Sequence, residues 1–260
     1  MLWGVDECVV FFGVVAAFCA VLEIGFRLGR RHRARSDDAA KSHVSALQAA
    51  LLGLLALLLG FNFAMAASRF DARKALIQDE VNAIGTAYLR AQLLSPRQRQ
   101  EVTQLLRAYV AARIEFMGAG IDKALLETAH TSATRIEAQL WTLAGEAAAR
   151  DSSAVPTGLF IQSLNDMINV NEKRLAVQDN HVPEVVIHLL FAVAVGAPGF
   201  IAYGYGLAGQ RRHGSTAIFA LLIALVLTII LDMDRPRRGL IRIGEESVLR
   251  LQETLERDTP

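Results

Sequence analysis

An amide and an imidazole lie within segments that are otherwise apolar. Asn62 lies in the uncharged run 44–68, and His188 lies near the start of the run 185–210. A polar group in hydrocarbon needs a hydrogen-bond partner or water. Asn62 therefore predicts either a hydrogen bond between helices or a place on the wall of a pore. An ionisable side chain at membrane depth is a candidate functional site, but His188 is shallow enough to lie as a neutral imidazole at the interface.

Two carboxylates follow the last apolar segment. Asp232 and Asp234 precede three arginines in the stretch DMDRPRRG. Calcium takes about six to eight oxygen ligands, so the pair is a weak metal site unless Glu245, Glu246 or backbone carbonyls assist. The alternative is a salt-bridged turn at the membrane surface.

Enzyme motifs are absent from the sequence. It has no HExxH, no GxSxG and no phosphate-binding loop, and its six histidines are scattered without metal-ligand spacing. Cys8 and Cys19 lie on one predicted helix about 16 Å apart, which is too far for a disulfide. We expect a protein that is not an enzyme and that holds no cofactor, with calcium as the weak exception.

Apolar residues are concentrated in four segments. The chain has 260 residues, of which 53% are hydrophobic, and a mean hydropathy of +0.32. The segments are 8–26, 44–68, 185–210 and 214–231. Each is close to the roughly 20 residues that cross a bilayer as a helix, so we expect four membrane helices. The first follows acidic rather than basic residues, which favours a retained anchor over a secretory signal.

Charge indicates the orientation of these helices and the kind of partner. The net charge is only +1, and basic residues are not interleaved with aromatics, so we expect no nucleic-acid partner. Lys and Arg are enriched in short cytoplasmic loops. The two basic loops contain Arg27, Arg30, Arg31, Arg33, Arg35 and Lys41 in one case, and Arg211 and Arg212 in the other. Both are predicted to be cytoplasmic, which places the N-terminus, the segment 69–184 and the C-terminal tail outside.

The long segment between the second and third apolar runs is predicted to be helical. Apolar residues recur at heptad spacing from Phe70 to Ala91 without a turn signal, so the second membrane helix should continue as one rod to about Leu94. In SPRQ, Ser95 can cap a new helix and Pro96 fits its first position. Its predicted inward face is Val102, Leu105, Leu106, Tyr109, Arg113 and Phe116. Further helices are expected at about 122–149 and 157–179, and a short strand is possible only in GLIRI, 239–243.

We therefore expect an all-α membrane protein in four parts. Residues 1–68 contain the first two membrane helices with a basic cytoplasmic loop at 27–43, and 69–182 form a helical extramembrane domain. Residues 183–232 contain the last two membrane helices, and 233–260 form a C-terminal tail. The glycine-rich stretch GAPGFIAYGYG, 196–206, predicts a kink or a close approach to a neighbouring helix.

One face of the second membrane helix has a regular apolar spacing. Leu57, Phe61 and Met65 recur every four positions and therefore stack along one side. Such a row can pack against lipid or protein, or can form a narrow apolar constriction in a pore.

The run GFNFAMAASRFDARKALIQDEVNAIGTAYLRAQLLSP, followed after the last membrane helix by LDMDRPRRGLIRI, resembles the bestrophin-like family of bacterial membrane proteins of unknown function. With the four apolar segments, the resemblance spans nearly the whole chain. Bestrophins are pentameric anion channels whose second membrane helix lines the pore and whose acidic cluster after the fourth helix binds calcium. The chain departs from them in its predicted orientation and in having only Asp232 and Asp234 in that cluster.

The resemblance implies an oligomeric ion channel of the bacterial inner membrane, with five copies as in bestrophins. Its pore would be lined by Leu57, Phe61, Asn62 and Met65. The alternative is a non-conducting membrane scaffold or sensor, in which the long helix transmits contacts and no water-filled path exists.

Overall fold

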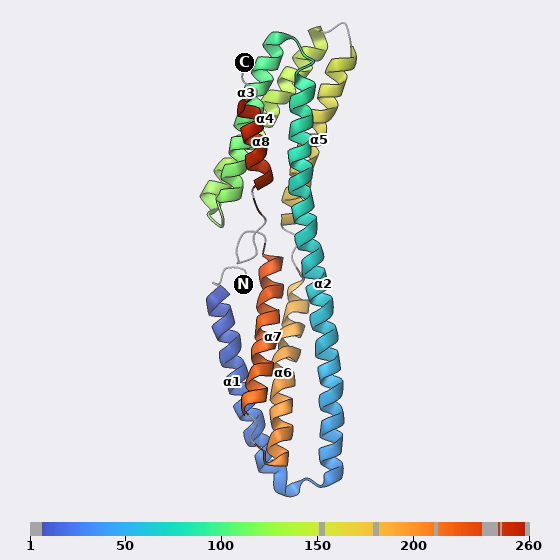
Figure 1. Cartoon of the computed structure of the whole chain (residues 1–260), viewed down its shortest axis with the longest axis vertical. Helices are drawn as coiled ribbons and strands as arrows, with labels where there is room; N and C mark the ends of the chain where they lie inside the picture. Colours follow the sequence, from blue (N-terminus) through green and yellow to red (C-terminus); the bar gives the residue numbers. More distant parts are fainter. Residues whose placement is uncertain are drawn as a thin grey trace. The chain divides into compact units, whose positions relative to one another are not determined.

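The structure is a computed structural model of the chain. It describes residues 7–150, 154–178, 182–210, 213–235, 244 and 246–257. Its helices are α1 (Glu7–His32), α2 (Asp38–Ala91), α3 (Pro96–Gly118), α4 (Lys123–Arg150), α5 (Ala154–Gln178), α6 (Glu184–Ala208), α7 (His213–Asp234) and α8 (Glu246–Arg257), with a 3-10 turn η2 (Arg33–Arg35) (Figure 1). No β-strand occurs among the described residues, and the candidate strand 239–243 lies outside them.

The expected all-α membrane fold is confirmed. Four helices, α1, α2, α6 and α7, are long and apolar enough to cross a membrane. The chain divides into two compact units, Met1–Phe70 with His181–Arg235, and Asp71–Asn180 with Pro236–Pro260. Helix α2 contributes to both units without a break, as predicted from the missing turn signal.

The first unit contains the apolar helices. Its core is formed by buried side chains from all four helices, including Phe18, Leu55, Leu190 and Leu227. Because lipid tails are as apolar as these side chains, close packing rather than the hydrophobic effect must hold such helices together. Between α1 and α6, glycine residues allow such close packing.

Backbones of α1 and α6 approach each other closely. A Cβ atom on Gly25 would collide with the carbonyl oxygen of Gly199, and one on Gly29 would collide with that of Tyr203. A Cβ on Gly206 would likewise meet the carbonyl oxygen of Phe26. The close approach predicted for the glycine-rich stretch is thereby confirmed at Gly199 and Gly206.

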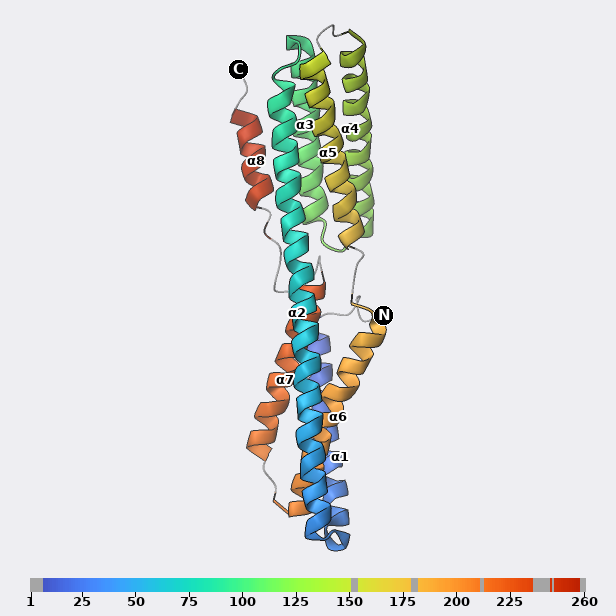
Figure 2. The same cartoon turned by 90° about the vertical axis from the view of Figure 1, so that its right-hand side faces the viewer.

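The second unit is a helical bundle built from the end of α2 with α3, α4, α5 and α8 (Figure 2). The heptad stripe predicted on α2 is buried at Ile77, Ile84, Tyr88 and Ala91. Helix α3 begins at Pro96 with Ser95 as its N-cap, and the Ser95 hydroxyl donates to Oε1 of Gln98 (2.7 Å) rather than capping the backbone.

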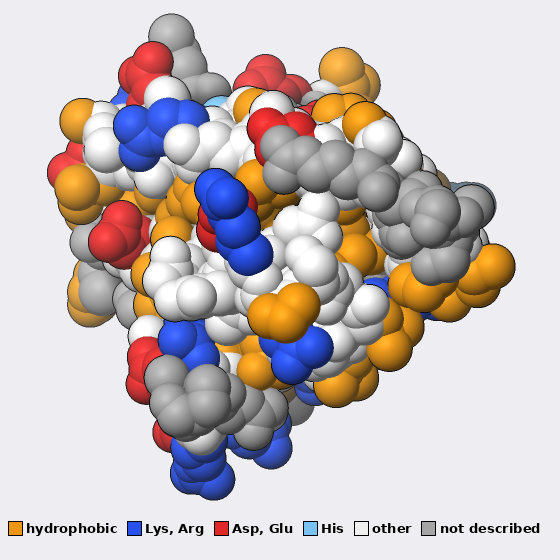
Figure 3. All heavy atoms as spheres, turned by 90° about the horizontal axis from the view of Figure 1, so that it is seen from above, with side chains coloured by type: hydrophobic (Ala, Val, Ile, Leu, Met, Phe, Trp, Pro, Cys, Tyr) orange, Lys and Arg blue, Asp and Glu red, His pale blue; other side chains and the backbone are white. Residues whose placement is uncertain are grey.

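Helix α8 packs on α3 within this bundle. Its residues Val248 and Leu255 are buried, and the Arg107 guanidinium donates from Nε and Nη2 to the Leu255 carbonyl at 2.9 and 2.6 Å. A cation at the last carbonyls of a helix is favourable. The face seen in Figure 3 carries acidic and basic side chains interspersed with hydrophobic ones, so neither sign of charge dominates its described part.

We expect Gly29→Ala to destabilise the protein, because its new methyl group has no space against the α6 backbone. Overpacking of this kind costs about 1–3 kcal/mol. Gly13→Ala on the same helix is the matched control, since a Cβ there has nothing within 4 Å and alanine favours helix. Thermal unfolding in detergent should show a lower midpoint for Gly29→Ala only. Equal midpoints would show that the α1–α6 contact tolerates a side chain.

Candidate functional site

Helix α2 leaves most of its apolar surface uncovered within one chain. Only 6% of its most apolar window is buried, compared with 39% for α6 and for α7. Leu57 and Phe61 are exposed at 54% and 63%, and Leu54 beside them at 46%. Met65, the third member of the predicted row, is half-buried against the cluster of Val182, Ile187 and Leu231. The row is therefore open at Leu57 and Phe61 and becomes part of the protein core at Met65.

Asn62 lies on a different side of α2 from the exposed row. It aligns with Leu55 and Ala66, and all three are buried. Its Nδ2 donates to the carbonyl oxygen of Leu58 in its own helix at 2.8 Å. Its Oδ1 is buried and has no hydrogen-bond partner among the described residues. A buried acceptor of this kind requires a donor from water or from another molecule.

His188 lies in the second turn of α6 with its side chain exposed. It is not part of the buried clusters of the first unit. Its proposed role as an ionisable group at membrane depth stays a prediction.

Asp234 joins three segments of the first unit. Its side chain is buried, and its Oδ2 accepts a hydrogen bond from the backbone N–H of Val182 at 3.0 Å. Its Oδ1 lies 3.5 Å from Nη1 of Arg69 on α2. A buried carboxylate requires such partners to remain charged. Asp234 therefore connects the end of α7 to α2 through Arg69 and to the residues before α6 through Val182.

Asp232 is also buried, and its carbonyl oxygen accepts a hydrogen bond from the N–H of Arg235 at 3.1 Å. Among the residues that the structure describes, no group of three or more His, Cys, Asp and Glu side chains could hold a metal ion. A guanidinium and a backbone amide contact Asp234, as expected of a structural ion pair.

A second charged cluster lies in the core of the bundle. Glu80 of α2 accepts from Nε of Arg113 on α3 at 2.6 Å, and its other oxygen contacts Nη1 of Arg174 on α5. All three side chains are nearly inaccessible. Arg113 also lies over the ring of Phe116, with 4.8 Å from Cζ to the ring centroid. One carboxylate thus links three helices through charge-assisted hydrogen bonds.

Glu137 of α4 extends this cluster. The Tyr109 hydroxyl donates to its Oε1 at 3.0 Å, and Asn171 Nδ2 donates to the same atom at 2.8 Å. Burial raises the pKa of Glu137, while these two hydrogen bonds lower it in part. Burial also raises the pKa of Tyr109 far above its usual value, so its hydroxyl remains a donor. Burial lowers the pKa of Arg113, and the nearby Tyr109 and Glu137 raise it in part.

Sequence reasoning placed Arg113 on the inward face, which is confirmed, but missed its partners. Glu80 lies three residues after Ile77 and four before Ile84, so it occupies the same buried stripe. Glu137 follows Ile136 directly and precedes Leu140 by three. Charged residues inside an apolar periodicity were the signal that could have identified the cluster.

The chain was compared with known proteins. A family model described as the Bestrophin-like domain matches residues 12–248. No curated protein matches the chain. A crystal structure of a bacterial bestrophin homologue from Klebsiella pneumoniae matches with a TM-score of 0.67 at 15% identity, covering 97% of this chain and 96% of that chain. A variant of that homologue with an isoleucine-to-threonine substitution matches with the same score and identity, covering 96% and 98%.

We expect Glu80→Gln to destabilise the bundle by about 3–5 kcal/mol, because it removes the buried carboxylate that contacts both Arg113 and Arg174. Asp79→Asn is the matched control, since Asp79 is the exposed neighbour. Amide hydrogen exchange should show faster exchange in α2–α5 for Glu80→Gln alone. Unchanged exchange in both variants would contradict a structural role for the charged cluster.

Proposed function

The chain belongs to the bestrophin-like family, and we propose that it forms a homo-oligomeric ion channel in the bacterial inner membrane. In this proposal the four apolar helices cross the bilayer, and α2 helices of several copies surround one pore. The copy number would be five by family resemblance. The proposal requires neither a bound cofactor nor a catalytic step.

The observation that carries the proposal is the open row Leu57 and Phe61 on α2. A membrane helix with only 6% of its apolar window buried within its own chain must be covered by lipid, by other copies or by a narrow pore. We propose that Leu57 and Phe61, which lie one turn apart on the same side of α2, face a narrow pore between copies. Apolar rings of this kind control conduction by excluding water from a constriction.

Asn62 and Met65 would border this constriction. Met65 packs into the protein beside the row, and the unpaired Oδ1 of Asn62 would take its donor from water or from a second copy. We assign no calcium role to Asp234, because Arg69 and the Val182 N–H already contact its two oxygens.

A non-conducting scaffold or sensor is the second candidate. It is favoured by the continuity of α2, which carries backbone hydrogen bonds without a break from the membrane unit into the bundle. In that reading, Leu57 and Phe61 contact lipid or another subunit, and no water-filled path exists.

We expect Phe61→Ala to raise ion leak severalfold in liposomes that contain the purified protein, because the smaller side chain admits water to the constriction. Phe63→Ala is the matched control, since Phe63 is also exposed but points to the opposite side of α2. Flux of chloride, potassium and calcium should be measured under a gradient.

Two outcomes would remove the channel proposal. One is flux equal to that of empty liposomes in the wild type, in Phe61→Ala and in Asn62→Leu. The other is a stable monomer by native mass spectrometry in mild detergent, since four helices cannot surround a channel. Weakened assembly of Asn62→Leu with unchanged flux would place that amide between helices.

The two basic loops predict that residues 27–41 are cytoplasmic and that the helical bundle lies outside. If Arg35 is cytoplasmic, a periplasm-active reporter fused after Leu94 should be active and one fused after Arg35 should be inactive. The reverse pattern would place the bundle in the cytoplasm.

A further inference from the structure

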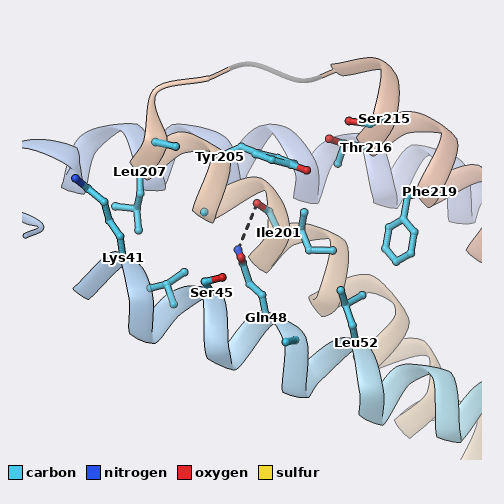
Figure 4. A pocket seen from close by; sticks show the side chains of 14 residues that line it. Lys41, Ser45, Gln48, Leu52, Ile201, Tyr205, Leu207, Ser215, Thr216 and Phe219 are labelled. Carbon is cyan, nitrogen blue, oxygen red and sulfur yellow. Dashed lines mark hydrogen bonds between the residues drawn. The ribbon is translucent and has the colours of Figure 1, made fainter. Parts of the chain in front are cut away.

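A cavity of about 650 Å³ lies in the first unit between the start of α2, the end of α6 and the start of α7 (Figure 4). Its size falls in the range of about 300–1,000 Å³ that is usual for ligand sites. The lining is mixed, with Lys41, Ser45, Tyr205 and Thr216 among the polar residues. None of its residues belongs to the exposed row of the proposed pore.

Polarity changes along the depth of this cavity. Lys41 and Ser45 lie in the first two turns of α2, and Thr216 lies in the first turn of α7. Leu52, Ile201 and Phe219 lie farther along the same helices, toward the middle of the apolar segments. The distance from residue 41 to residue 52 is about 16 Å along the helix axis. Val44 and Leu207 also line the first end, so the two ends differ in that the charged Lys41 lies at the interface end and Leu52, Ile201 and Phe219 lie toward the hydrocarbon.

The polar end lies within a basic region of the chain. Residues 27–41 contain six Lys and Arg and two Asp, a formal charge of six minus two, or +4. The Arg33 guanidinium lies directly against Gly209, the C-cap of α6. Lys41 pairs with Asp38 at 2.8 Å, but that carboxylate is fully exposed. An exposed pair is weak, so a phosphate can replace Asp38 as the partner of Lys41.

Gln48 lines the cavity and joins α2 to α6. Its Nε2 donates to the Phe200 carbonyl oxygen at 2.7 Å, and the absent side chain of Gly204 leaves space for this amide. Because Gln48 is already bonded to the α6 backbone, the charged contact to a ligand falls to Lys41. Figure 4 shows Ser45 beside Gln48 and Lys41 at the end of the cavity.

We propose that this cavity binds one anionic phospholipid. The phosphate lies at the basic end near Lys41 and Ser45, and an acyl chain follows Leu52, Ile201 and Phe219 toward the hydrocarbon. A basic pocket between membrane helices is the arrangement that recognises anionic headgroups. A soluble anion does not account for the apolar half, and an uncharged amphiphile does not account for Lys41. The site is independent of whether the protein conducts ions.

Native mass spectrometry with added lipid tests the proposal on the full chain. Ala49 lines the cavity and Ala50 does not, although both are exposed on α2. We expect the wild type and Ala50→Phe to retain phosphatidylglycerol in preference to phosphatidylcholine. Ala49→Phe, which fills the cavity, should lower the retained lipid by about tenfold. Equal retention by Ala49→Phe and Ala50→Phe would overturn the proposal.

Charge is tested separately and does not depend on filling the cavity. Lys41→Gln should lower the preference for phosphatidylglycerol by about fivefold, the effect of about one basic residue at an anionic surface. Arg35→Gln removes an equal charge from the same basic region outside the lining and should have no effect. An equal loss in both variants would indicate diffuse surface charge and would overturn the site. Displacement of the lipid by glycerol phosphate would also overturn it, because the ligand would then be a soluble phosphate.

Discussion

The fold depends on the unbroken backbone hydrogen bonding of α2. In hydrocarbon every backbone N–H and C=O must be hydrogen-bonded within the helix. In water a helix can end wherever the sequence contains a turn signal. The chain contains no such signal between Asp38 and Ala91. One helix therefore supplies Leu55 to the membrane core and Ile84 to the bundle core. The remaining apolar surface of α2 is not covered by this chain.

Buried charge specifies where α2 meets its neighbours in each unit. Arg69 contacts Asp234 at the end of the membrane unit, and Glu80 contacts Arg113 and Arg174 within the bundle. Apolar stripes alone tolerate a shift by one turn, since hydrophobic contacts are not directional. A buried carboxylate that lost its guanidinium would be strongly penalised, so these pairs select one register.

Features with a local signal were predictable from the sequence, and features made by distant pairs were not. The four apolar segments, the run of α2 through Ile84 and the start of α3 at Pro96 each have a signal within a few residues. Periodicity assigns Arg113 to a buried face but does not name Glu80 as its partner. Likewise, the sequence allowed Asp232 and Asp234 either a weak metal site or a salt-bridged turn, and it did not identify Arg69, far away in the sequence, as a partner of Asp234. The cavity at Lys41 depends on three separate helices and has no sequence signature at all.

The glycine contact between α1 and α6 also bears on how the protein is made. Gly25 and Gly199 are 174 residues apart (199 − 25), and ribosomes add about 5–20 residues per second. Helix α1 is therefore synthesised roughly 10–35 s before the part of α6 that it contacts. The glycine face of α1 is therefore made well before the α6 surface against which it packs, and this contact forms late in synthesis.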